Sequence, residues 1–181
     1  MRLKQARWNR EVDEDNILSE EVISFLLDKH SYFSSHDYRE VKASLVSVKR
    51  HLYITQKDPY PRTLEIDAVI YYKLKRQVLS IGLELKYLTD VYKLVEVIGQ
   101  AKVRRNLFNY FYIITKGSPE YLGYKIREAI RTNAFQALER EKIGWIFVCD
   151  ERIFFLYPSR KISIPSIPSL DNFMDREDKK V

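Results

Sequence analysis

The sequence is poor in the residues that characterise several common classes of small protein. Its 181 residues include one cysteine, Cys149, which excludes a disulfide framework and the zinc modules that need several cysteines. Its three histidines have no metal-ligand spacing to one another or to that cysteine. Five glycines and six prolines exclude collagen-like and low-complexity chains. No apolar run approaches the roughly 18 residues of a membrane-spanning helix, so we expect no membrane span.

The composition is that of one folded domain with an excess of positive charge. Hydrophobic residues make up 45% of the chain and charged residues 31%, with a formal net charge of +6. The first ten residues are basic and polar and lack an apolar signal-peptide core, so we expect an intracellular, cytoplasmic protein. Residues 86–131 hold nine basic and four acidic side chains. Such a local excess is typical of a nucleic-acid-binding face, and an ordinary solvated surface is the alternative.

Hydrophobic periodicity predicts an α/β fold in which helices flank a mixed sheet. Strands alternate apolar and polar residues or form short apolar runs, and we expect them at 41–55, 63–72, 77–87, 110–115, 144–149 and 152–157. Amphipathic helices are expected at about 19–30, 91–108 and 119–141, and a turn at 34–37. The connection 73–76 is short enough to make an antiparallel hairpin. We expect the domain to span 1–157, and a Pro/Ser-containing, weakly ordered tail to span 158–181.

Two carboxylates and an ammonium are expected to meet on this hairpin. Asp67 lies on the strand 63–72, on the face opposite Ile66 and Ala68, and Glu84 and Lys86 share one face of the strand 77–87. Hard oxygen ligands of this kind suit Mg²⁺ or Mn²⁺, and a neighbouring lysine can orient a water or stabilise charge on a phosphate. The alternative is a cross-strand ion pair on a solvated face of the sheet.

The spacing and the order of elements resemble those of the PD-(D/E)xK nuclease superfamily, the restriction endonuclease-like fold. Ile66-Asp67 and, 17 positions after Asp67, Glu84-Leu85-Lys86 resemble its motif, and the expected order α-β-β-β-α-β between Ser19 and Thr115 resembles its core. The resemblance implies that Asp67, Glu84 and the Leu85 carbonyl ligate the metal and that Lys86 assists the attacking water. Ile66 stands where many members have proline.

Two further positions resemble accessory residues of the family. Glu20 lies where the resolvase-like members carry a glutamate on the first helix, with Glu21 as the alternative, and favourable placement at a helix N-terminus explains both equally well. Gln100 is similar to a glutamine that several branches carry on the helix after the third strand, although it also suits an ordinary exposed position. The RecB-type branch has a tyrosine four residues after this glutamine, where this chain has Arg104.

The sequence therefore predicts a Mg²⁺- or Mn²⁺-dependent DNA endonuclease. Among members of the superfamily, it most resembles the archaeal Holliday-junction resolvases. That resemblance implies a homodimer acting on branched DNA. The alternatives are an exonuclease, a nickase or a restriction-type nuclease of the same fold, or a non-catalytic nucleic-acid-binding or assembly protein. No P-loop, G-x-G-x-x-G or nucleophile elbow is present, so we expect no organic cofactor. Candidate phosphate contacts are Lys49, Arg50, Lys93, Lys102, Arg104 and Arg105.

Overall fold

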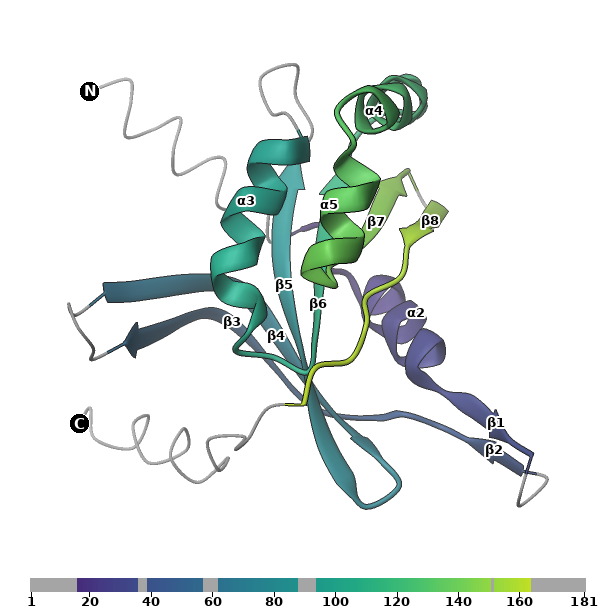
Figure 1. Ribbon diagram of the computed structural model, residues 1–181. Coiled ribbons are helices and arrows are strands. Elements are labelled where there is room, and N and C mark those ends of the chain that lie inside the picture. The colour runs from purple at the N-terminus through teal and green to yellow at the C-terminus, as the bar shows by residue number, and fades with distance from the viewer. Residues whose placement is uncertain (1–15, 36–38, 57–61, 88–93, 151, 164–181) are drawn as a thin grey trace.

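A six-stranded sheet lies at the centre of the structure, a computed structural model that describes residues 16–35, 39–56, 62–87, 94–150 and 152–163 (Figure 1). Its order is β3-β4-β5-β6-β7-β8. The β3–β4, β4–β5 and β7–β8 pairs are antiparallel, and β5–β6 and β6–β7 are parallel, so the sheet is mixed as expected. The strands are β3 (Ser44–Gln56), β4 (Arg62–Leu74), β5 (Gln77–Tyr87), β6 (Tyr110–Lys116), β7 (Gly144–Cys149) and β8 (Arg152–Tyr157).

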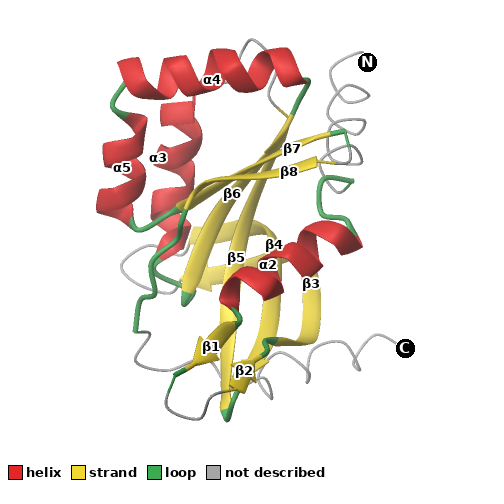
Figure 2. Ribbon diagram, turned by 90° about the vertical axis from the view of Figure 1, so that its right-hand side faces the viewer, coloured by secondary structure: helices red, strands yellow, loops and turns green. Residues whose placement is uncertain are grey.

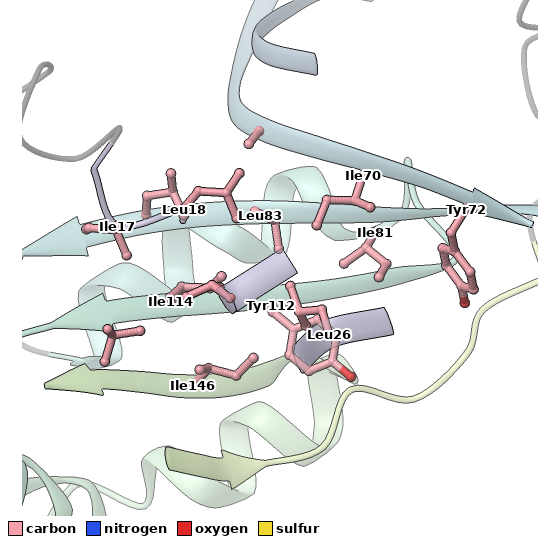
Figure 3. Packing of buried hydrophobic residues seen from close by; sticks show 14 of the residues in the cluster. Ile17, Leu18, Leu26, Ile70, Tyr72, Ile81, Leu83, Tyr112, Ile114 and Ile146 are labelled. Carbon is pink, nitrogen blue, oxygen red and sulfur yellow. The ribbon is translucent and has the colours of Figure 1, made fainter. Parts of the chain in front are cut away.

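Helices cover both faces of this sheet (Figure 2). Helix α2 (Glu20–His30) places Val22 and Leu26 in a core with Ile70, Leu83 and Ile114 (Figure 3). Helices α3 (Leu94–Arg105) and α5 (Ala134–Glu141) bury Val97, Ile98 and Leu138 against the opposite face. Helices α2, α3 and α5 therefore bury their apolar residues against the sheet, with α2 on one face and α3 and α5 on the other.

The expectation of one helix over 119–141 is wrong, because two helices occupy this segment. Helix α4 (Pro119–Arg131) ends at Thr132, and α5 begins after Asn133. Asn133 has a φ of 55° in the left-handed region, which asparagine tolerates better than most residues. The break lets α5 pack beside α3 while α4 crosses the ends of both helices (Figure 2).

The turn expected at 34–37 falls between the two strands of a small hairpin that the sequence did not predict. Strand β1 (Tyr32–Ser34) pairs antiparallel with β2 (Arg39–Val41), and the long strand that follows begins at Ser44 instead of residue 41. The amide of Ala43 donates to the Ser31 hydroxyl at 2.9 Å, which ties the exit of this hairpin to the end of α2.

Residues 158–163 form hydrogen bonds with residues at the start of β6. The Phe111 amide donates to the Ser159 hydroxyl at 3.1 Å, and the Ile162 amide donates to the Asn109 carbonyl at 2.9 Å. The rest of the tail, 164–181, and the basic segment 1–10 lie outside the described residues. In the part of the chain that the structure describes, no helix combines the length and apolarity needed to cross a membrane.

Candidate active site

The site begins where the strands β4 and β5 part. Their pairing runs from Leu74 and Gln77 to Ala68 and Leu83, and Asp67 and Glu84 are the next residues on the two strands. The Leu85 amide donates to the Asp67 carboxylate (Oδ2) at 2.7 Å. A side-chain oxygen thus replaces the backbone carbonyl that a continued ladder would supply, and the Asp67 carboxylate is fixed against β5.

The alternation of faces expected along β4 changes at this point. Ala68 and Ile70 lie in the α2 core as expected, but Ile66 packs in the α3 core with Val69. On the neighbouring strand, His51 lies between the Cα pairs Arg50–Ala68 and Leu52–Ile66 and has a φ of 49°. A residue in that region reverses the direction of the side chains that follow it on β3, and Leu52, the partner of Ile66, packs in the α3 core as well.

Glu84 is the centre of a charge cluster formed with Asp67, Lys86 and Arg104. Its side chain is only 2% exposed. The Lys86 ammonium lies 3.5 Å from Glu84 Oε1 and 3.9 Å from Asp67 Oδ2, so one cation contacts both carboxylates. Arg104, in the last turn of α3, donates through Nη1 to Glu84 Oε2. The period of two on β5 places Glu84 and Lys86 on the α3 face, where Arg104 reaches Glu84.

Burial raises the pKa of Glu84, and the charge of Asp67 raises this pKa further. Lys86 and Arg104 lower the pKa of the same carboxyl, Arg104 also through its hydrogen bond. Two carboxylates held together in a region of low dielectric are costly unless cations lie beside them. The charge cluster therefore depends on its two cations in the metal-free protein.

The residues present suit a hard divalent cation. Asp67 and Glu84 supply carboxylate oxygens, the donors that Mg²⁺ and Mn²⁺ prefer, and a cation between them would relieve the repulsion that raises the pKa of Glu84. Within the described residues, no group of three or more His, Cys, Asp or Glu side chains is placed to hold a metal. A site of one or two carboxylates completed by water and substrate phosphate is typical of Mg²⁺.

The two accessory candidates are both exposed residues of helices. Glu20 is exposed at the first residue of α2, and Ser19 caps the helix by accepting from the Val22 amide at 3.4 Å. The pKa of Glu21 is lowered by its hydrogen bond to Ser19, as favourable placement at a helix N-terminus would produce. Gln100 is exposed on α3, one turn before Arg104. Neither Glu20 nor Gln100 makes a hydrogen bond or ion pair to the charge cluster within the described part of the chain.

The candidate phosphate contacts fall into different environments. Lys102 is exposed and pairs with Glu141 at 3.1 Å, and Lys49 is half-buried on β3. Arg50 donates to the Leu18 carbonyl at 2.8 Å, which anchors the segment before α2. Arg104 belongs to the charge cluster, a role that the sequence did not reveal because its partner lies 20 residues away. Lys93 lies outside the described residues.

Arg105 is not a phosphate contact, since it is 2% exposed. Its guanidinium donates to four backbone carbonyls, those of Lys142, Phe108, Asn109 and Arg160. Burial lowers its pKa to about 10, so the group stays charged at neutral pH. Arg105 therefore joins the end of α3 to the segments around residues 142 and 160. The amphipathic pattern of this helix does not distinguish the buried Arg105 from the exposed charged residues beside it.

Comparison with family models, with curated proteins and with solved structures found no match to this chain, so the site is interpreted from its own residues.

Proposed function

We propose that the protein is a metal-dependent DNA endonuclease of restriction endonuclease-like fold. The observation that carries the proposal is the convergence of Asp67, Glu84 and Lys86 where β4 and β5 part, with one ammonium in contact with both carboxylates. The order of elements from α2 through β3, β4, β5 and α3 to β6 supports it, because this is the α-β-β-β-α-β order of the PD-(D/E)xK nucleases, with β1 and β2 as an addition.

Each member of the charge cluster has a distinct part in this proposal. Asp67, Glu84 and the Leu85 carbonyl would hold the metal, and the Leu85 amide keeps the Asp67 carboxylate in place. Bound Mg²⁺ or Mn²⁺ supplies a more acidic water and stabilises negative charge on the phosphate. Lys86 has three N–H donors, with which it orients the attacking water beside the carboxylates. Arg104 lowers the pKa of Glu84, which burial raises, and so favours the ionised form of this carboxyl.

The substrate class in this proposal is branched DNA, cut by a homodimer. Two cuts on opposite strands of a junction need two sites, and each chain offers one charge cluster. An exonuclease, nickase or restriction-type nuclease would use the same residues and would differ in the DNA substrate that it cleaves. The choice among these activities rests on the substrate cleaved, since the chemistry of the cluster is common to all of them.

A non-catalytic nucleic-acid-binding protein is the second candidate, and Arg104 favours it. With Lys86 and Arg104 both in contact with the carboxylates, the cluster balances its charge without a metal. Such a balanced network can serve structure alone, as buried ion networks in many proteins do. The two candidates differ in one property, because only the nuclease needs the carboxylates for a reaction.

The experiment is a cleavage assay on labelled four-way junction, flap, linear duplex and single-stranded DNA with Mg²⁺ or Mn²⁺. The wild type is compared with Lys86→Gln and with Arg127→Gln, a control that removes one exposed charge on α4. Paired cuts on the junction, lost in Lys86→Gln and kept in the control, support the proposal. Cutting of other substrates indicates a related nuclease. Binding of DNA with no cleavage of any substrate in any variant identifies the binding protein instead.

A further inference from the structure

A second charged feature lies away from the charge cluster, at the end of β4 that carries Lys73 and Leu74. The β1–β2 hairpin and the β4–β5 turn form the walls of a groove of about 1020 Å³. Both hairpins project at the same end of the molecule (Figure 2). The basic residues that line this hairpin groove are Arg39, Lys42, Lys73, Lys75, Arg76 and Lys161.

Six basic residues and one acidic residue line the described part of the hairpin groove, so its net charge is positive. Glu40 is its one acidic residue among those described, and it pairs with Lys42 at 3.4 Å on an exposed surface. Lys73 and Arg76 are exposed at the end of the β4–β5 hairpin and belong to neither hydrophobic core. Charged residues at a hairpin end also protect sheet edges, but that need does not explain why Lys161, from a distant segment, joins the same groove.

The chemistry of the lining favours a phosphate backbone over unpaired bases. Single-stranded nucleic acid is held by aromatic platforms on which bases stack. Among the described residues that line the groove, Tyr32 is the one aromatic side chain, and the Lys75 ammonium lies 5.4 Å from the centre of its ring. Long, exposed lysine and arginine side chains are the groups that neutralise the phosphates of a duplex.

We propose that the hairpin groove binds the phosphate backbone of duplex DNA at a distance from the cleaved bond. Asp67 and Lys73 are six residues apart on β4, and at about 3.3 Å per residue this separates the charge cluster from the groove by about 20 Å. At about 3.4 Å per base pair, the groove contacts the duplex about six base pairs away from the scissile phosphate. The choice of DNA as the ligand rests on the proposed function, whereas the binding itself needs no metal and no reaction.

The test is DNA binding in EDTA, measured by fluorescence anisotropy on a labelled 20-base-pair duplex at several salt concentrations. The groove variant is Lys73→Gln/Arg76→Gln, and the matched control is Arg127→Gln/Arg131→Gln, which removes two exposed charges from α4 at the other end of the molecule (Figure 2). Loss of two phosphate contacts should weaken binding by about tenfold or more and reduce the salt slope by about two. The control should change the affinity by less than about twofold.

Three results would overturn the inference. The first is equal affinity of the groove variant and its control, and the second is absence of duplex binding by the wild type in EDTA. The third is binding of the wild type to vesicles of anionic lipid without binding to DNA, which would assign the groove to a membrane surface. Because the binding test contains no metal, absence of cleavage by the wild type with groove binding intact would reject the proposed nuclease and keep this inference. Cleavage by the wild type, together with equal DNA affinity of the groove variant and its control, would reject the groove proposal alone.

Discussion

The Asp67 carboxylate accepts a hydrogen bond from the Leu85 amide at 2.7 Å, at the point where β4 and β5 stop pairing. This bond joins a residue proposed to hold the metal to the strand that carries Glu84 and Lys86. The same oxygen lies 3.9 Å from the Lys86 ammonium. Substitutions at Asp67 therefore affect both the stability of the sheet and the proposed chemistry, and the two effects can be separated.

Asp67→Ala should destabilise the protein more than Asp67→Asn. Alanine leaves the Leu85 amide without its acceptor, which costs about 1–3 kcal/mol, whereas the asparagine carbonyl can still accept the hydrogen bond. Urea unfolding of both variants measures this difference. Equal stabilities of the two variants would show that the bond to Leu85 contributes nothing, and would remove the argument that it holds the carboxylate in place.

Arg104→Gln should lower the stability of the metal-free protein and increase its response to Mg²⁺. Glu84 then loses one of its two cations while still buried, at a cost of about 1–3 kcal/mol once the partial exposure of Arg104 is considered. A bound divalent cation compensates for that loss, so the rise in Tm on adding Mg²⁺ should be larger than in the wild type. Thermal unfolding with and without Mg²⁺ measures both quantities. The prediction fails if Mg²⁺ raises the Tm of the variant no more than that of the wild type.

Arg105→Met should be among the most destabilising single substitutions in the chain. It removes the donors from four carbonyls that meet around the end of α3, and we expect a loss of about 3 kcal/mol or more. Lys102→Met is the matched control, because Lys102 is exposed on the same helix, and its effect should stay within about 0.5 kcal/mol. Similar unfolding free energies for the two variants would contradict the structural role of Arg105.

His30 should make the protein sensitive to mild acid. Burial among Tyr72, Tyr110 and Tyr112 lowers the pKa of His30 to about 4, below its usual value near 6.5. The unfolded chain therefore takes up a proton between pH 6.5 and pH 4 that the folded protein does not. Stability should fall as the pH falls through this range, by at most about 3 kcal/mol.

The His30→Phe variant tests this effect, since phenylalanine also has an aromatic ring at this position but cannot be protonated. The wild-type Tm should fall more steeply than that of the variant between pH 6.5 and pH 4. The hydrogen bond between the Tyr112 hydroxyl and His30 Nε2, at 3.3 Å, is lost in the variant and shifts its Tm at pH 7. The change of Tm with pH is therefore the informative quantity. Parallel pH profiles would assign the acid sensitivity to other groups.

The sequence predicted those parts of the fold that depend on local pattern. Alternation and short apolar runs located β5, β7 and β8 at their observed bounds, and the period of two placed Glu84 and Lys86 on one face. The break at Asn133 was missed because amphipathicity continues across it, so only the left-handed backbone marks the end of α4. The β1–β2 hairpin was missed because three-residue strands carry almost no periodicity.

Contacts between residues far apart in the chain could not be predicted from the sequence. The salt bridge of Arg104 to Glu84 depends on where α3 crosses β5, and the burial of Arg105 depends on segments up to 55 residues away. The face change at Ile66 lies beside the left-handed backbone of His51 on the neighbouring strand. The hairpin groove likewise forms only when three separate segments meet. Pattern therefore identifies candidate residues, and tertiary packing decides which of them act together.

The most direct test of the central claim is Mn²⁺ binding by isothermal titration calorimetry without DNA, on the wild type and on Asp67→Asn. This measurement needs no knowledge of the substrate, and the asparagine variant keeps an acceptor for the Leu85 amide. We predict that the wild type binds Mn²⁺ and that Asp67→Asn binds it at least about tenfold more weakly. Equal binding by the two proteins, or none by the wild type, would contradict the assignment of Asp67 and Glu84 as a metal site.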